Sequence, residues 1–385
     1  MTAGHRRLRV LVVAPERHAL RQPHAGGLEA VVWDRVRRLR RRGHDVTLCA
    51  ADGSDFLGDR PELRLPSPRW MRAQDASDSA NPPGHRRAMT AAFDRVLESL
   101  LTPGRGVDVV DNHSLHGDPI RWSSTAGIPV VTTLHTPPLP EIVEAAGDVG
   151  DAPHRFVAVS QHTARAWSAA GVDAFVFPNG VDTARWRLGD GGGISGGRTR
   201  GDWVWFGRIV PEKAPHLAIH AARLAGARIV LAGRIGDPTY FVREIAPLLG
   251  DDAHYAGPLH QPALSRLVGS SAVALVTPVW SEPFGLVLAE ALATGTPVAA
   301  FDAGGVGEVL DGMPGAAVVA PGDVQALSDA ATMLATQARG IGQRAAIRRA
   351  AVARYSLDRR DRDVERVLAH TAMGSPATVE RAVVG

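Results

Sequence analysis

The fold is indicated most clearly by residues 280–298, which read WSEPFGLVLAEALATGTPV. An apolar run, residues 272–277, leads into this stretch, and Pro283 and Gly285 bend it. Apolar residues at helical spacing follow from 286 to 292, before a glycine and a proline end the helix. The pattern predicts the end of a buried strand, a turn, a short helix that opens near Gly285, and another strand.

Two carboxylates frame this turn. Glu282 lies on the loop before the predicted helix, and Glu290 lies about one turn inside it and leans back toward the helix N-terminus. The amides of residues 284–287 carry the positive end of the helix dipole and suit a phosphate. Glu290 is placed to accept ribose hydroxyls, and Glu282 could accept sugar hydroxyls. The arrangement favours a nucleotide diphosphate sugar over an ordinary helix with two solvated glutamates.

The run Glu-Pro-Phe-Gly-Leu with a second glutamate eight positions after the first resembles the donor-site signature of glycosyltransferase family 4. The resemblance implies a GT-B fold, in which two doubly wound Rossmann-like α/β domains enclose an active site in the cleft between them. It also implies retaining transfer of a sugar without a metal. The implied donor-binding residues in this stretch are Glu282, Phe284, Gly285, Leu286, Val287 and Glu290.

Length and composition are those of a soluble protein of two ordinary domains, with 385 residues, 45% of them hydrophobic. No apolar run is long enough to cross a bilayer. The single Cys49 excludes an internal disulfide and a thiolate zinc site, and it suits a reducing cytoplasm. The net charge of +3 gives no reason to expect nucleic acid. Among 43 basic residues only Lys213 is a lysine, and it lies in a motif.

The N-terminal region predicts the first unit of a doubly wound domain. An apolar run at 8–14 is followed by a loop to Gly26 and Gly27 and by a helical pattern at 28–42. The two glycines resemble the family's N-terminal glycine loop, which implies contact with the donor. The arginine-rich segment Arg35–Arg42 has two interpretations: solvated charges that complement the helix dipole, or a patch that contacts an anionic membrane while the enzyme uses a lipid acceptor.

Predicted strands at 107–111 and 130–134 each run into histidine-bearing sequence. His135 resembles the family's histidine beside the donor sugar, and ligands collect at the carboxyl ends of such strands. For His113 and His116 we favour a structural role. The irregular, proline-rich stretch 52–87 is the first candidate for holding the acceptor, and a disordered insert is the alternative.

The second half of the sequence begins with a predicted strand and loop, residues 202–214, which resemble the family's phosphate-binding motif. Arg208 can form a forked contact with a diphosphate, and Lys213 supplies a point charge. The alternative is a surface charge pair. The resemblance places Leu259 near the base, and Gly307 stands where the family usually has proline.

We therefore expect an N-terminal acceptor-side domain at 1–188, a glycine-rich linker at 189–201, a donor domain at 202–355, and a helical segment at 356–385 that crosses back. The expected reaction moves a sugar from a UDP-sugar, or else a GDP- or ADP-sugar, to a hydroxyl of a small molecule, glycan or lipid. Cofactor, metal and nucleic acid are not expected, and the predicted location is the cytoplasm with peripheral membrane contact as an option. A sugar-nucleotide epimerase and a non-catalytic binding protein remain as alternatives. The predicted catalytic residues are His135, Arg208, Lys213 and Glu282.

Overall fold

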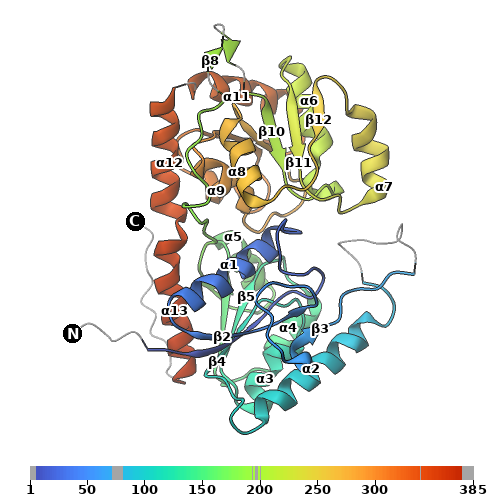
Figure 1. Cartoon of the computed structure of the whole chain (residues 1–385), viewed down its shortest axis with the longest axis vertical. Coiled ribbons are helices and arrows are strands. Elements are labelled where there is room, and N and C mark those ends of the chain that lie inside the picture. Colours follow the sequence, from blue (N-terminus) through green and yellow to red (C-terminus); the bar gives the residue numbers. More distant parts are fainter. Residues whose placement is uncertain are drawn as a thin grey trace, which may run out of the picture.

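The structure is a computed structural model that describes residues 6–71, 81–192, 194–195, 198–199, 201–338 and 340–374. Figure 1 shows two α/β domains stacked one on the other, with helices α12 (Ile341–Tyr355) and α13 (Leu357–Ala372) running down one side of both. The two doubly wound domains that the sequence predicts are therefore present.

The first domain is built on a parallel sheet whose described strands have the order β3-β2-β1-β4-β5-β6-β7. The strands are β1 (Arg9–Val13), β2 (Asp45–Ala51), β3 (Arg64–Leu65), β4 (Val109–Asn112), β5 (Val130–Leu134), β6 (His154–Ala158) and β7 (Phe175–Val176). The helices are α1 (Gly27–Arg41), α2 (His85–Leu101), α3 (Asp118–Ala126), α4 (Pro140–Gly147) and α5 (Gln161–Ala169). Strand order reverses at β1, which is where ligands bind in such sheets.

Strand β1 explains why helices cover both faces of this sheet. Its four last residues, 10–13, are fully buried, as expected for a strand inside a parallel sheet. Val10 and Val12 pack in a core cluster with residues of α1 and α13, whereas Leu11 and Val13 pack with α2. The alternation of side chains along a strand thus divides one apolar run between two cores.

The second domain repeats this plan with the order β12-β11-β10-β13-β14-β15, again all parallel. Its strands are β10 (Trp203–Phe206), β11 (Ile229–Ala232), β12 (Ala253–Tyr255), β13 (Ala274–Val276), β14 (Val298–Phe301) and β15 (Ala316–Val319). Its helices are α6 (Pro215–Leu224), α7 (Pro238–Tyr240), α8 (Gln261–Ser270), α9 (Leu286–Ala293), α10 (Val306–Leu310) and α11 (Val324–Gln337). Here the order reverses between β10 and β13.

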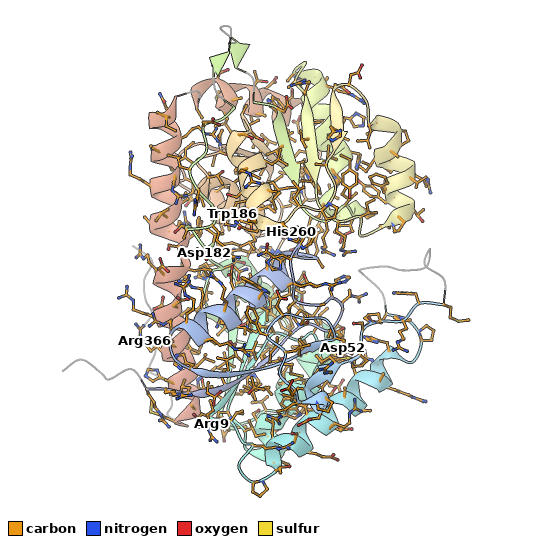
Figure 2. All side chains as sticks on the ribbon, viewed as in Figure 1. Arg9, Asp52, Asp182, Trp186, His260 and Arg366 are labelled. Carbon is orange, nitrogen blue, oxygen red and sulfur yellow. The ribbon has the colours of Figure 1, made fainter. Side chains whose placement is uncertain are left out.

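The chain joins the second domain earlier than the expected linker at 189–201. Val181 and Trp186 already pack in the core beneath β10 and α9, and Figure 2 shows Trp186 close to the junction of the domains. The Gly189 amide donates to Thr294 O at 2.9 Å, so the start of the glycine-rich segment lies against the second domain. Within it, β8 (Ile194–Ser195) pairs with β9 (Arg198–Thr199). Glycine content alone could not show this packing.

Helix α13 returns to the first domain, where Val367 and Leu368 are buried in the same core cluster as β1. The residues that the sequence proposed as a membrane patch serve this contact. Arg38 pairs with Asp358 and Asp361, and Arg42 pairs with Glu365. Partners inside the protein also hold Arg35 (Asp111), Arg37 (Asp34 and Asp182) and Arg40 (the carbonyls of Val46 and Phe56). Five of the six arginines in this run thus have partners within the chain, and Arg41 is exposed.

The candidate acceptor stretch 52–87 is only partly described, since residues 72–80 lie outside the described residues. A 3-10 turn, Pro61–Leu63, leads into β3 at the edge of the sheet, and Leu63 and Leu65 are buried against α2. Part of the stretch therefore belongs to the core. In the part of the chain that the structure describes, the helices are all too short or too polar to cross a membrane.

Candidate active site

The predicted site residues of the two domains meet between the two sheets. Gly26 and Gly27 follow β1, and the loop after β10 carries Arg208. A Cβ atom on Gly26 would lie 3.3 Å from Arg208 Cδ, and one on Gly27 would lie 3.6 Å from Leu286 Cβ. The glycine loop of the first domain therefore lies directly against the arginine loop and the start of α9 in the second.

The loop that carries Lys213 is fixed by the end of β13. Lys213 ends a 3-10 turn, Pro211–Lys213, and Ala214 after it has a φ of +43°. The Thr277 hydroxyl lies 2.8 Å from Lys213 O and 3.0 Å from Ala214 O, and it accepts a hydrogen bond from Trp205 Nε1 at 3.1 Å. This bonding holds an unfavourable backbone conformation in place and points the lysine at the next loop.

Lys213 and Glu282 form an ion pair between Nζ and Oε2. Trp280 Nε1 donates to the same carboxylate oxygen at 2.9 Å, and the ammonium lies 5.1 Å from the centre of the Trp280 ring. The sequence assigned Lys213 to the diphosphate and Glu282 to the sugar without relating the two. The two charges neutralise each other, so a phosphate must compete with Glu282 for the lysine.

Helix α9 begins at Leu286, and Gly285 precedes it with a φ of +76°. The predicted helix start at Gly285 is therefore confirmed. Glu290 is partly exposed near Asp34 of α1 and near Arg185, which pairs with Asp34. Burial, together with the Asp34 carboxylate, raises the pKa of Glu290 to about 8. A pKa in this range favours the protonated carboxyl at neutral pH.

Four of the predicted donor residues have side chains that pack in or against the core. Phe284 is 3% exposed and packs edge-to-face against Tyr355 with ring centres 5.9 Å apart. Leu259, Leu286 and Val287 are partly buried against the same cluster. The backbone of Phe284 is the part that can reach a ligand, which agrees with the predicted use of amides at the start of α9.

His135, just after β5, contacts a residue for which the sequence favoured a structural role. Its Nε2 lies 2.8 Å from His113 Nδ1, and His113 Nε2 lies 3.2 Å from Asp111 Oδ1. Asp111 Oδ2 in turn pairs with Arg35 at 3.3 Å. The signal in the sequence was the spacing: residues 111 and 113 are two apart at the end of β4, and this spacing places side chains on one side of an extended chain.

The donor loop is also bonded to the first domain. Ser160 Oγ donates to Pro283 O at 2.5 Å, and Glu308 accepts hydrogen bonds from the amides of Gln161 and His162 at 2.8 and 3.0 Å. Glu308 of one domain thereby caps the N-terminus of α5 in the other. Sequence reasoning did not identify this contact because it joins residues about 146 positions apart.

The loop between β14 and α10, just before Gly307, lies directly on the Glu282 turn. A Cβ atom on Gly304 would lie 2.4 Å from Glu282 N, and the Gly305 amide donates to Glu282 O at 2.6 Å. At Gly307, where the family usually has proline, a Cβ atom would lie 2.6 Å from Asp302 Oδ1. The Asp302 carboxylate thus occupies the space that a side chain at position 307 would need, which explains the glycine in this chain.

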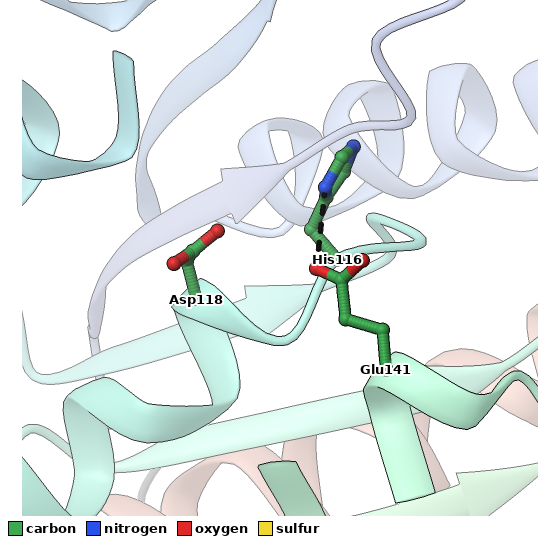
Figure 3. A group of neighbouring side chains, drawn as sticks. All are labelled: His116, Asp118 and Glu141. Carbon is green, nitrogen blue, oxygen red and sulfur yellow. Dashed lines mark ion pairs between the residues drawn. The ribbon is translucent and has the colours of Figure 1, made fainter. Parts of the chain in front are cut away.

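Figure 3 shows a group outside this site, His116, Asp118 and Glu141, whose possible ligand atoms lie within 4.8 Å of one another. His116 Nδ1 lies 3.6 Å from Glu141 Oε1, and its Nε2 lies 3.5 Å from Glu16 Oε1. Burial opposes protonation, but these two carboxylates raise the pKa of His116 to about 9. A protonated imidazole offers no lone pair to a metal. The group is therefore an ion-pair network around a histidine cation.

Comparisons with known proteins agree with this geometry. Residues 25–185 match the model of Glycosyltransferase Family 4, and residues 200–337 match that of Glycosyl transferases group 1. The chain is 32% identical to the D-inositol 3-phosphate glycosyltransferase of Acidothermus cellulolyticus, over 77% of this chain and 76% of that protein. It is also 32% identical to the protein of that name from Mycolicibacterium paratuberculosis, over 84% and 81%.

Two solved structures share the fold at low identity. Sucrose-phosphate synthase from Thermosynechococcus elongatus has a TM-score of 0.72 at 16% identity, with 95% of this chain and 99% of that chain covered. Anabaena HepE in complex with UDP-glucose has a TM-score of 0.69 at 18% identity, with 94% and 99% covered.

Proposed function

Because this chain belongs to glycosyltransferase family 4 and is a glycosyltransferase of the GT-B fold, we propose that it transfers a sugar from a UDP-sugar to a hydroxyl group, with retention of anomeric configuration and without a metal. The observation that carries the proposal is the close approach of the two domains, with Gly26 against Arg208 and Gly27 against Leu286, together with the Lys213–Glu282 pair. These groups suit the diphosphate and the sugar of one ligand.

The main task of the site is to stabilise the negative charge that develops on the leaving diphosphate. Arg208, Lys213 and the first amides of α9 can stabilise it as the bond from the anomeric carbon to the phosphate oxygen breaks. The bond from that carbon to the acceptor oxygen forms on the same face, and the departing phosphate takes the acceptor's proton. His135 orients the sugar. Burial holds the pKa of His135 well below its ordinary value, which makes it a poor general base.

Thermal shifts with UDP, GDP, ADP, dTDP and NAD would test the donor site. We expect UDP to stabilise the protein, by about 2.7 kcal/mol at a hundredfold excess over its Kd. The response should disappear in Arg208→Ala and persist in Arg223→Ala, a control in the same domain whose partner is Asp252 on the surface. A response to GDP or ADP in place of UDP would reassign the base. A response to NAD alone would contradict the proposal.

Turnover then separates a transferase from an epimerase or a binding protein. UDP release should depend on an added acceptor, and inositol 3-phosphate is the first to test because the relatives carry its name. The anomeric coupling of the product, measured by NMR, should match that of the donor. Inversion would refute the retaining mechanism, and a new UDP-sugar formed without acceptor would favour an epimerase.

A further inference from the structure

We propose that Asp111 and His113 form a positioning relay that holds His135 as the Nε2–H tautomer, so that His135 Nδ1 accepts a hydrogen bond from a hydroxyl of the donor sugar. The inference deepens the proposed function and rests on it, since it gives His135 a partner in the sugar. Asp111 and His113 are both 0% exposed, whereas His135 is partly exposed. The first two can therefore act only through the third.

The backbone brings these groups into line. Asp111 is the third residue of β4, and the amide of His113 donates to Val13 O at 2.8 Å on the neighbouring strand β1. Strand β5 pairs with β4 and delivers His135 one residue past its end. The loop after β4 is fixed by Asn112, which donates to Thr132 Oγ1 at 3.1 Å and accepts from the Ser114 amide at 3.0 Å. The two imidazole rings are 5.1 Å apart between centres.

The ionised carboxylate of Asp111 decides which ring nitrogens of His113 and His135 carry a proton. Burial works against the charge of Asp111, but Arg35 and His113 lower its pKa to about 2, so Asp111 only accepts. His113 Nε2 and Asp111 Oδ1 lie 3.2 Å apart as an ion-pair contact, and in the described part of the chain both are buried atoms without an aligned hydrogen bond. A proton on His113 Nε2 that is directed at Asp111 Oδ1 would satisfy both atoms. With one proton per ring, His113 Nδ1 has the lone pair, and His135 Nε2 supplies the hydrogen of the 2.8 Å contact.

The remaining nitrogen of His135 is consequently unprotonated. Burial, aided by His113 and then by Arg35, holds the pKa of His135 well below its ordinary value, so the ring stays neutral. Nδ1 then offers a fixed acceptor on the partly exposed side of the ring. A sugar hydroxyl that donates to it is held in one orientation, which a freely tautomerising histidine would not provide.

The variant Asp111→Asn reverses the relay without changing its shape. Arg35 Nη1 can only donate, so the new amide must turn its oxygen toward Arg35 and its NH₂ toward His113. His113 Nε2 would become the acceptor, His113 Nδ1–H would donate to His135 Nε2, and His135 would carry its proton on Nδ1. Nitrogen-15 NMR of histidine-labelled protein distinguishes these tautomers. The His135 signal is identified by its loss in His135→Gln.

We expect the Nε2–H tautomer of His135 in the wild-type protein and the Nδ1–H tautomer in Asp111→Asn. In turnover, Asp111→Asn and His113→Phe should lower kcat/KM for the UDP-sugar by about tenfold to a hundredfold. The Kd for UDP, which lacks the sugar, should not change. His154→Gln is the matched control: His154 is a buried histidine on the neighbouring strand β6 with a contact to Ser123, and its loss should leave the His135 tautomer and kcat/KM unchanged.

An Nδ1–H tautomer in the wild-type protein, or the same tautomer in Asp111→Asn, would overturn the relay. So would a fall in UDP affinity equal to the fall in kcat/KM, because that result indicates a general loss of structure. The tautomer is measured without substrate. The relay can therefore fail while UDP binding and transfer are normal, and the proposed transferase activity can fail while the tautomer is as predicted.

Discussion

Replacing Glu290 by glutamine should stabilise the empty protein at pH 8 while weakening its binding of UDP. In the folded protein the pKa of Glu290 is about 8, raised by burial and by Asp34, whereas a glutamate in water titrates near 4.5. Between these values the folded protein holds a proton that the unfolded chain has released. The free energy of unfolding therefore falls as the pH rises from about 4.5 to about 8.

The size of the effect follows from the two pKa values. If the whole difference acted on stability, it would amount to about 5 kcal/mol at pH 8 and above. Glu290 keeps partial contact with water and lies near Arg185, which opposes the rise. We therefore expect Glu290→Gln to gain about 2 kcal/mol at pH 8 and less than about 0.5 kcal/mol at pH 5.

Urea denaturation of both proteins at pH 5 and pH 8 measures this difference, and calorimetric titration with UDP at pH 8 should show affinity lower by about tenfold. Glu282→Gln, on the loop that precedes α9, is the matched control. Its carboxylate serves Lys213 and Trp280, so removing it leaves an unpaired ammonium and should give no gain. A gain for Glu290→Gln that is equal at the two pH values, or a loss at pH 8, would refute the reasoning.

Two further predictions concern the contacts between domains. Glu308→Gln removes the negative charge that caps α5 and should lower kcat severalfold with little change in UDP affinity. Steady-state kinetics and calorimetry measure these two quantities. An unchanged kcat would mean that the cap plays no part in turnover. Arg42→Ala removes the ion pair with Glu365 of α13 and should lower the free energy of unfolding, measured by urea denaturation, by about 1 kcal/mol. Arg41→Ala, at an exposed position, should lower it by almost nothing. Equal losses in the two variants would contradict the role assigned to the Arg42–Glu365 pair.

The parts of this protein that the sequence predicts are those encoded in short segments. A strand, a turn and a helix start can be read from residues 272–292, and so can the positions of Glu282 and Glu290 on them. The same holds for Arg208 and Lys213 on one loop. Both doubly wound domains follow from repeating such units along the chain.

The parts that the sequence could not predict depend on which distant residues meet. The pairing of Arg42 with Glu365 spans 323 positions, and that of Lys213 with Glu282 spans 69. The contact of His113 with His135 depends on the pairing of β4 with β5, which no local pattern gives. Surface charge runs such as Arg35–Arg42 look alike whether they face water, lipid or another helix.

Because lysine is so scarce in this sequence, the loop that carries Lys213 can be labelled selectively through its side-chain amine. Lys213 is the one lysine side chain in the sequence, and the one thiol, Cys49, is buried with a raised pKa. An amine-selective reagent therefore has one side-chain target, beside the α-amino group of the chain, and that target lies against Glu282. A fluorophore or cross-linker can be attached beside the donor loop without engineering, and any ligand that occupies the lysine will slow that attachment.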